Sequence, residues 1–190
     1  MTQAIASTDS ARNGLLKIAA AGVVTGILTP LLVPLADYIL GTSGDFRIAL
    51  VAIPFAMLVL VVVKRGSANP NWAALAAAII TMIAFVGAVN AAIWIDGQAH
   101  DASKLLRNIL SGLAGGFVGA TIMALGIALL PAGPRDATAW LRMLITGTLA
   151  GSLMALDNAL ELDLTSVLYP VWQAGVATRL AVALRRTTDS

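Results

Sequence analysis

The sequence of 190 residues contains no cysteine and only one histidine, His100. Without cysteine the chain can form no disulfide, thiolate nucleophile or thiolate metal site. A single histidine excludes bis-histidine haem ligation within the chain, and the sequence holds no G-x-S-x-G, H-E-x-x-H or P-loop pattern. We therefore expect no enzymatic activity, no metal and no cofactor.

Charged residues are also scarce. They make up 12% of the chain, whereas 58% of the residues are hydrophobic and the mean hydropathy is +0.87. A soluble domain has about 25% charged residues, which it needs on its surface, and about 45–50% apolar residues. The composition therefore indicates an integral membrane protein whose first partner is the lipid bilayer. The net charge of +2 does not indicate a nucleic-acid partner, because the basic residues lie at the ends of apolar segments.

Six apolar segments predict an all-α, polytopic bundle of transmembrane helices. A spanning helix needs about 20 residues to cross a hydrocarbon core about 30 Å thick. The second segment is slightly short and the fifth is at the lower limit of this length. The first is longer than the apolar region of a signal peptide, so we expect it to be retained as a helix. The segments are 15–40, 48–63, 72–95, 109–130, 140–156 and 164–184.

The basic residues predict the orientation of this bundle. If the N-terminus lies inside, nine Lys and Arg residues fall on the inner side, and only Arg47, Lys104 and Arg107 fall on the outer side. Short inner loops carry an excess of Lys and Arg. We therefore expect six spans in one transmembrane domain (15–184), with inner tails at 1–14 and 185–190. The bias towards alanine and arginine is typical of a bacterial inner membrane.

Glycine recurs at four-residue spacing in the fourth and fifth segments. Small residues let the backbones of two membrane helices approach closely, because lipid supplies no hydrophobic drive for helices to associate. The simpler interpretation is packing within one monomer, and the alternative is contact with a second copy or with another membrane subunit. The expected packing residues are Gly112, Gly115, Gly116, Gly119, Gly147 and Gly151.

Two prolines interrupt the first segment. Pro30, Pro34 and Asp37 share one face of a helix, and each proline leaves the carbonyl one turn earlier without its backbone donor. Irregular backbone at membrane depth is tolerated where it lines a cavity, so this stretch is the best candidate for a solute pathway. The simpler alternative is a kink, with Asp37 at the outer interface. The expected pathway residues are Pro30, Pro34, Asp37, Asn90, Thr146, Ser152 and Gln173.

Acidic residues gather in the predicted outer loops. Asp157, Glu161 and Asp163 lie close together in the last of these loops and could attract cations, or could form a solvated cap. Gln173 lies near the middle of the last segment, where an interhelical hydrogen bond is its simplest role.

Two classes of function fit these features. The first is a transport or channel subunit for an ion or small polar solute, in which backbone and side-chain dipoles replace water at a constriction. The second is a non-catalytic accessory or scaffold subunit of a larger membrane complex, in which the small-residue faces bind partner helices.

The two functions predict different results for single substitutions. Transport predicts that Asp37→Asn or Gln173→Leu abolishes solute flux into vesicles while the protein still folds. The accessory role predicts that Gly115→Leu or Gly151→Leu separates a complex seen by native mass spectrometry. Unchanged flux in the Asp37→Asn variant would reject the proposed pathway.

Overall fold

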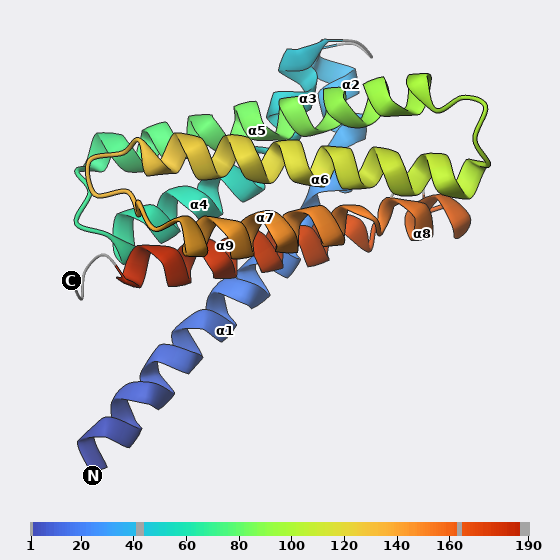
Figure 1. The fold of residues 1–190 in the computed structure, drawn as a ribbon. Coiled ribbons are helices and arrows are strands. Elements are labelled where there is room, and N and C mark those ends of the chain that lie inside the picture. Colours follow the sequence, from blue (N-terminus) through green and yellow to red (C-terminus); the bar gives the residue numbers. More distant parts are fainter. Residues whose placement is uncertain (1, 41–43, 163–164, 187–190) are drawn as a thin grey trace.

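The computed structural model describes residues 2–40, 44–162 and 165–186, and over these ranges the fold is all-helical without a strand. Several of the helices follow the predicted apolar segments. Three other helices are short and were not expected. Figure 1 shows their arrangement. The helices are α1 (Thr2–Leu31), α2 (Val33–Leu40), α3 (Asp45–Val51), α4 (Ile53–Gly66), α5 (Asn71–Gln98), α6 (Lys104–Ala128), α7 (Ala137–Gly151), α8 (Met154–Ala159) and α9 (Leu168–Arg186).

Four segments are long and apolar enough to cross a membrane, as in a multi-pass membrane protein. A fifth is added if α3 and α4, which are bent by 58° relative to one another, count as one span. The predicted sixth span, α9, is the least apolar of the long helices, because it carries Gln173, Arg179 and Arg185. The four segments are Ala11–Leu31, Asn71–Gln98, Lys104–Ala128 and Ala137–Ala159.

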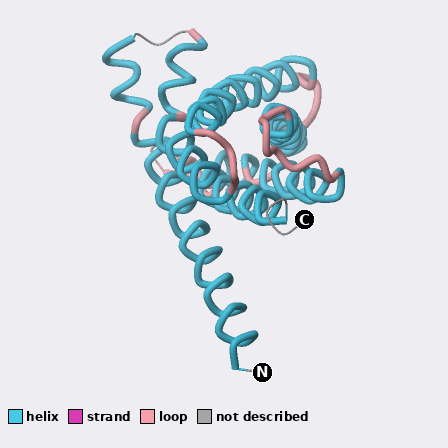
Figure 2. The backbone as a smooth tube through the Cα atoms, turned by 90° about the vertical axis from the view of Figure 1, so that its left-hand side faces the viewer, coloured by secondary structure: helices cyan, strands magenta, loops and turns pink. Residues whose placement is uncertain are grey.

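Five helices form a closed ring. In this ring α4 packs on α5, α5 on α6, α6 on α7, α7 on α9, and α9 returns to α4. Their fully buried side chains include Phe55, Met123, Met143 and Leu180, which fill one half of the bundle. The first helix, α1, lies outside the ring against α9 and α4, and its N-terminal part leaves the bundle (Figures 1 and 2).

The contact between α1 and α9 depends on glycine. A Cβ atom at Gly26 would overlap the backbone of Pro170, and one at Gly22 would lie 2.5 Å from Cα of Ala174. This approach lets the Gln173 amide donate a 2.8 Å hydrogen bond from Nε2 to Oγ1 of Thr29, with both side chains fully buried. Gln173 is thus an interhelical hydrogen-bonding residue.

The predicted packing glycines lie where α6 meets its two neighbours. Added Cβ atoms at Gly112 and Gly116 would overlap the carbonyl oxygens of Gly151 and Gly147 in α7. On another face of α6, a Cβ at Gly115 would lie 2.9 Å from the carbonyl oxygen of Ala88 in α5. The glycines therefore serve packing inside the monomer. Gly115→Leu and Gly151→Leu would disturb the fold itself and are poor tests of a larger complex.

The prolines produce a short interruption between α1 and α2. Only Leu32 lies between the two helices, and its N–H still donates to the carbonyl oxygen of Leu28 at 3.1 Å. Ala36 donates in turn to the carbonyl oxygen of Leu32 at 2.9 Å. The chain is therefore kinked here and not unwound. Beyond the kink, α2 and α3 form a small hairpin beside the ring (Figure 2). The ion pair between Asp37 and Arg47 joins these two helices.

We expect Gly151→Ala to destabilise the protein, because the added methyl group would force α6 and α7 apart. Overpacking of this kind typically costs about 1–3 kcal/mol, which should lower the midpoint of thermal unfolding in detergent by several degrees. Gly97→Ala in α5 is the matched control, since nothing lies within 4 Å of its added Cβ. Equal midpoints for the two variants would contradict the close contact between α6 and α7.

Candidate functional site

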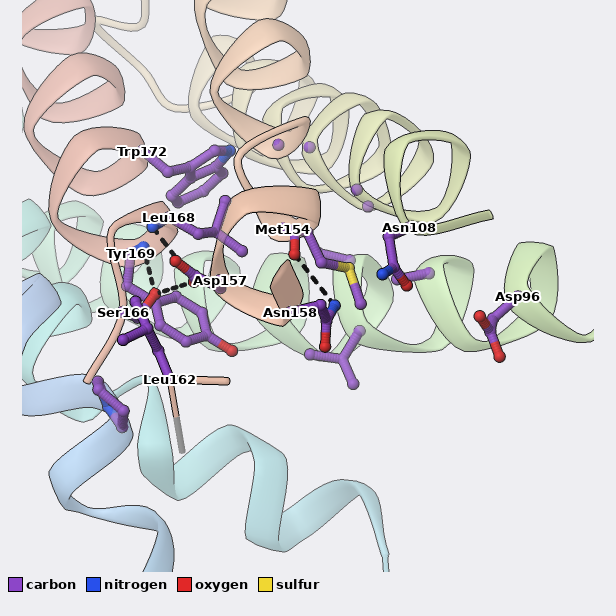
Figure 3. A pocket seen from close by; sticks show the side chains of 18 of the residues that line it. Asp96, Asn108, Met154, Asp157, Asn158, Leu162, Ser166, Leu168, Tyr169 and Trp172 are labelled. Atoms are coloured by element: carbon purple, nitrogen blue, oxygen red, sulfur yellow. Dashed lines mark hydrogen bonds between the residues drawn. The ribbon is translucent and has the colours of Figure 1, made fainter. Parts of the chain in front are cut away.

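A cavity of about 630 Å³ opens at one end of the bundle. This end, called the loop end below, is where residues 99–103 join α5 to α6. The cavity lies among the second half of α5, the first half of α6, α8 and the start of α9 (Figure 3). Its mouth holds Asp96, Lys104, Arg107 and Asn158, and its floor holds Phe85, Gly115, Gly116 and Trp172.

The floor lies deep in the bundle because α9 starts there. The ring of Tyr169, in the first turn of α9, stacks on Phe85 with the ring centroids 5.8 Å apart. Phe85 is in the middle of α5, roughly 20 Å from either end at the helical rise of 1.5 Å per residue. The described residues of the connection from α8 to α9 are non-helical and run into the bundle beside the cavity.

Asp157 caps the start of α9. Its Oδ1 accepts a hydrogen bond from the N–H of Val167 at 2.8 Å, and its Oδ2 accepts one from the Ser166 hydroxyl at 2.5 Å (Figure 3). The Ser166 hydroxyl oxygen in turn accepts from the N–H of Tyr169 at 3.1 Å. The first N–H groups of a helix have no intrahelical partner and carry partial positive charge. The Asp157 carboxylate therefore pairs and neutralises the end of a helix inside the protein.

The other two acids of the predicted outer cluster do not share this role. Glu161 is exposed and has a left-handed backbone φ of 52°. Asp163 lies outside the described residues. Asp157 thus acts in the described structure as a helix cap, and the attraction of cations by the three acids stays a prediction.

Asn108 is a polar side chain of the cavity lining without a hydrogen-bond partner among the described residues. It is only 8% exposed, it lines the cavity from α6, and its amide makes no hydrogen bond to any residue of the described ranges. Its amide nitrogen and oxygen are not fully enclosed by protein and are open to the cavity. This amide is therefore ready to bond to a molecule in the cavity. Asn108 lies one residue before the predicted fourth segment, and no local pattern distinguishes it.

The mouth of the cavity carries an ion pair and a further cation. Nε of Arg107 lies 2.9 Å from Oδ1 of Asp96, which joins the start of α6 to the end of α5. Lys104, one turn earlier in α6, forms no ion pair with an acid of the described chain. Among the lining residues of the mouth, two cations therefore face one carboxylate, and Asp101 lies outside the lining in the exposed turn before α6.

Of the predicted pathway residues, only Pro30 lines this cavity. Asp37 forms the ion pair with Arg47 in the α2–α3 hairpin. Asn90 is exposed, and its amide donates to Oδ1 of Asp45 at 3.0 Å, which ties α5 to α3. These residues therefore serve the hairpin, and Pro34 is an exposed member of it.

The remaining predicted residues lie on helix contacts away from the cavity. The Thr146 hydroxyl accepts a hydrogen bond from Nε of Arg179 at 3.3 Å, and that of Ser152 donates to the carbonyl oxygen of Leu149 at 2.7 Å. Gln173 bonds to Thr29 in the α1–α9 contact. The predicted set therefore does not line this cavity as one pathway, and Gln173→Leu would alter packing as well as any flux.

The described residues contain no group of three or more His, Asp or Glu side chains placed to hold a metal ion. Nε2 of His100 and Oδ1 of Asp101 lie 3.2 Å apart in an exposed turn. Comparison with protein-family models, curated proteins and solved structures gave no match. We therefore infer function from the cavity and from the helices that form it.

We expect Asp157→Ala to destabilise the start of α9. Loss of a capping side chain costs about 0.5–2 kcal/mol. Hydrogen exchange at the amides of Val167 and Leu168 should become faster, and thermal unfolding should begin at a lower temperature. Glu161→Ala is the control, because this neighbouring acid is exposed. Unchanged exchange at both amides would rule out the capping role.

Proposed function

We propose that this protein is a small membrane transport subunit that binds a solute in the cavity between α5, α6, α8 and α9. The observation that carries the proposal is the depth of the cavity together with the start of α9 beside the middle of α5. Non-helical chain at membrane depth occurs where it is buried in protein or lines a cavity. Transporter sites typically lie near the middle of the bilayer at interrupted helices.

The proposal includes six spans with both ends inside, in a bacterial-type inner membrane. Here α9 is the sixth span although it is the least apolar, because α1, α4 and α7 cover much of its surface. The bundle end opposite the loop end holds Lys64, Arg65, Arg135, Arg142 and Arg185. An inner location of these cations follows the positive-inside rule, and it places the mouth of the cavity on the outside.

The cavity is closed towards the inner side. Trp172 on the floor contacts Phe55 edge to face, with the ring centroids 5.5 Å apart. Below this pair, Met123 and Met143 are fully buried in the core. The arrangement supports a carrier that opens to one side at a time, since a channel needs a continuous path. In such a carrier the contact between Trp172 and Phe55 must separate during transport.

A second candidate, the accessory subunit, is favoured by the α2–α3 hairpin. Tyr38, Ile39 and Phe46 are 89%, 61% and 66% exposed, and the hairpin stands beside the ring (Figure 2). Apolar groups in this position can contact lipid or a partner helix. Native mass spectrometry of gently purified protein distinguishes these cases, because a stoichiometric foreign partner supports the accessory role.

Single cysteines test the proposed transport cycle directly, because the natural chain has none. In cells, a membrane-impermeant maleimide should label Asn108→Cys from the outside. In inverted vesicles, Met123→Cys should be labelled slowly from the inner side, because that residue becomes accessible only when the floor opens. Asp101→Cys is the fully exposed control, and Leu125→Cys is the control for a position that faces away from the protein core.

Both labelling results together support alternating access. Labelling of Asn108→Cys from the outside with no labelling of Met123→Cys from the inside indicates a fixed binding cavity and rejects transport. Failure of Asn108→Cys to react from the outside, where Asp101→Cys does react, rejects the proposed orientation or the open mouth. Circular dichroism and size-exclusion profiles confirm that each variant is folded.

A further inference from the structure

We propose that the ligand of this cavity is a small organic anion with a flat apolar body, and not an inorganic ion. The proposal rests on the solute-binding role proposed above and names the class of solute. The apolar body would lie on the aromatic floor, the Asn108 amide would bond to its polar portion, and its anionic end would lie at the mouth beside Lys104 and Arg107. Each part of the lining supports one part of this ligand.

The carboxylates of the cavity are already engaged. Asp157 accepts hydrogen bonds from Ser166, Val167 and Leu168, and Asp96 pairs with Arg107. A dehydrated metal cation needs several oxygen ligands, typically carboxylates and carbonyls. The rest of the lining is largely glycine, alanine and larger apolar side chains. An inorganic cation would therefore lose its water without gaining equivalent ligands.

The floor offers a flat apolar surface. The rings of Phe85 and Tyr169 stack on one another. Trp172 lies about one turn further along α9 and also lines the cavity (Figure 3). Gly115 and Gly116 of α6 add backbone surface without side chains. Aromatic side chains bind flat apolar groups by burial and by stacking. The cavity of about 630 Å³ lies within the range of about 300–1,000 Å³ that is common for organic ligands.

The middle of the cavity supplies hydrogen bonds. The amide of Asn108 has both donors and an acceptor, and it has no partner within the described chain. A hydrogen bond to this amide favours a ligand with a polar atom between its apolar body and its charged end. A purely apolar molecule would leave the amide unpaired.

The mouth favours negative charge. Among the lining residues at the mouth, Lys104 and Arg107 face Asp96, and both cations lie in the first turn of α6. The start of a helix adds partial positive charge from its free N–H groups. Deeper in the cavity, the charge of Asp157 is balanced by the start of α9. The field at the mouth therefore favours a carboxylate over an ammonium group.

Three matched probes test this ligand class on the full chain in nanodiscs of phosphatidylcholine. 4-Phenylbutyrate has the aromatic body and the anion, 4-phenylbutylamine replaces the anion with a cation, and butyrate lacks the aromatic body. Binding is measured by calorimetry, with empty nanodiscs subtracted. We expect phenylbutyrate to bind about tenfold more tightly than either of the others, which corresponds to one favourable charge contact or one buried ring.

Two substitutions in the cavity sharpen the test. Lys104→Gln should weaken phenylbutyrate binding, whereas Lys64→Gln at the opposite end should not. Asn108→Asp places a negative charge inside the cavity and should reverse the preference, so that phenylbutylamine binds more tightly than phenylbutyrate. This reversal shows that the ligand occupies this cavity, and it does not depend on a large change in the fold.

Each other result overturns part of the proposal. Equal or tighter binding of the amine to the natural chain rejects the anionic class, and equal binding of butyrate rejects the apolar body. Absence of binding by all three probes in the millimolar range rejects the ligand class as a whole. The cysteine-labelling result is independent of these probes, so a wrong ligand class and a wrong transport role remain distinguishable.

Discussion

Close backbone contact through glycine is the constraint on which the rest of this structure depends. Between helices in lipid, burial of apolar side chains gains little, so association depends on van der Waals contact and on interhelical hydrogen bonds. The α6–α7 contact has this form, because Gly112 faces Gly151 and Gly116 faces Gly147. The α1–α9 contact has the same form at Gly22 and Gly26. These contacts hold α9 between α1, α4 and α7, and the place of α9 defines the cavity.

The buried position of α9 explains its unusual composition. A helix whose neighbours cover it can carry Gln173 at its centre, provided that the amide has a partner such as Thr29. A helix that starts inside the protein also needs acceptors for its first N–H groups. Asp157 and Ser166 supply them. Because α9 is short, the space above its first turn is not filled by a helix, and this space is part of the cavity.

The long helices could be predicted because their apolar runs are continuous. The segments expected at 72–95 and 109–130 correspond to α5 (Asn71–Gln98) and α6 (Lys104–Ala128). The break at Leu32 lies between Pro30 and Pro34, where a kink was the simpler alternative predicted from the sequence. The break at Ala52 was missed because it lies inside a continuous apolar run. The predicted N-terminal limit of the last segment was four residues early, because 164–167 are apolar in part but precede the capped start of α9.

The site was harder to predict than the fold. Spacing along one helix shows which residues share a face, but it does not show which faces meet. Asp37 and Asn90 therefore looked like pathway residues, whereas the structure engages them with Arg47 and Asp45. Asn108 was missed because a single asparagine near a helix end is common. Gly22 and Gly26 do have the G-x-x-x-G spacing, so this contact could have been found from the sequence.

The contact between α1 and α9 also has a consequence for biogenesis. The hydrogen bond from Gln173 to Thr29 joins residues 144 positions apart, which makes it one of the least local interactions in the chain. Domains form from the N-terminus during synthesis, so α1 enters the bilayer long before its partner exists. Until α9 arrives, the glycine face of α1 and the Thr29 hydroxyl have no native neighbour. The closing of this contact therefore marks completed assembly, and a chain truncated before α9 should be open to membrane quality control.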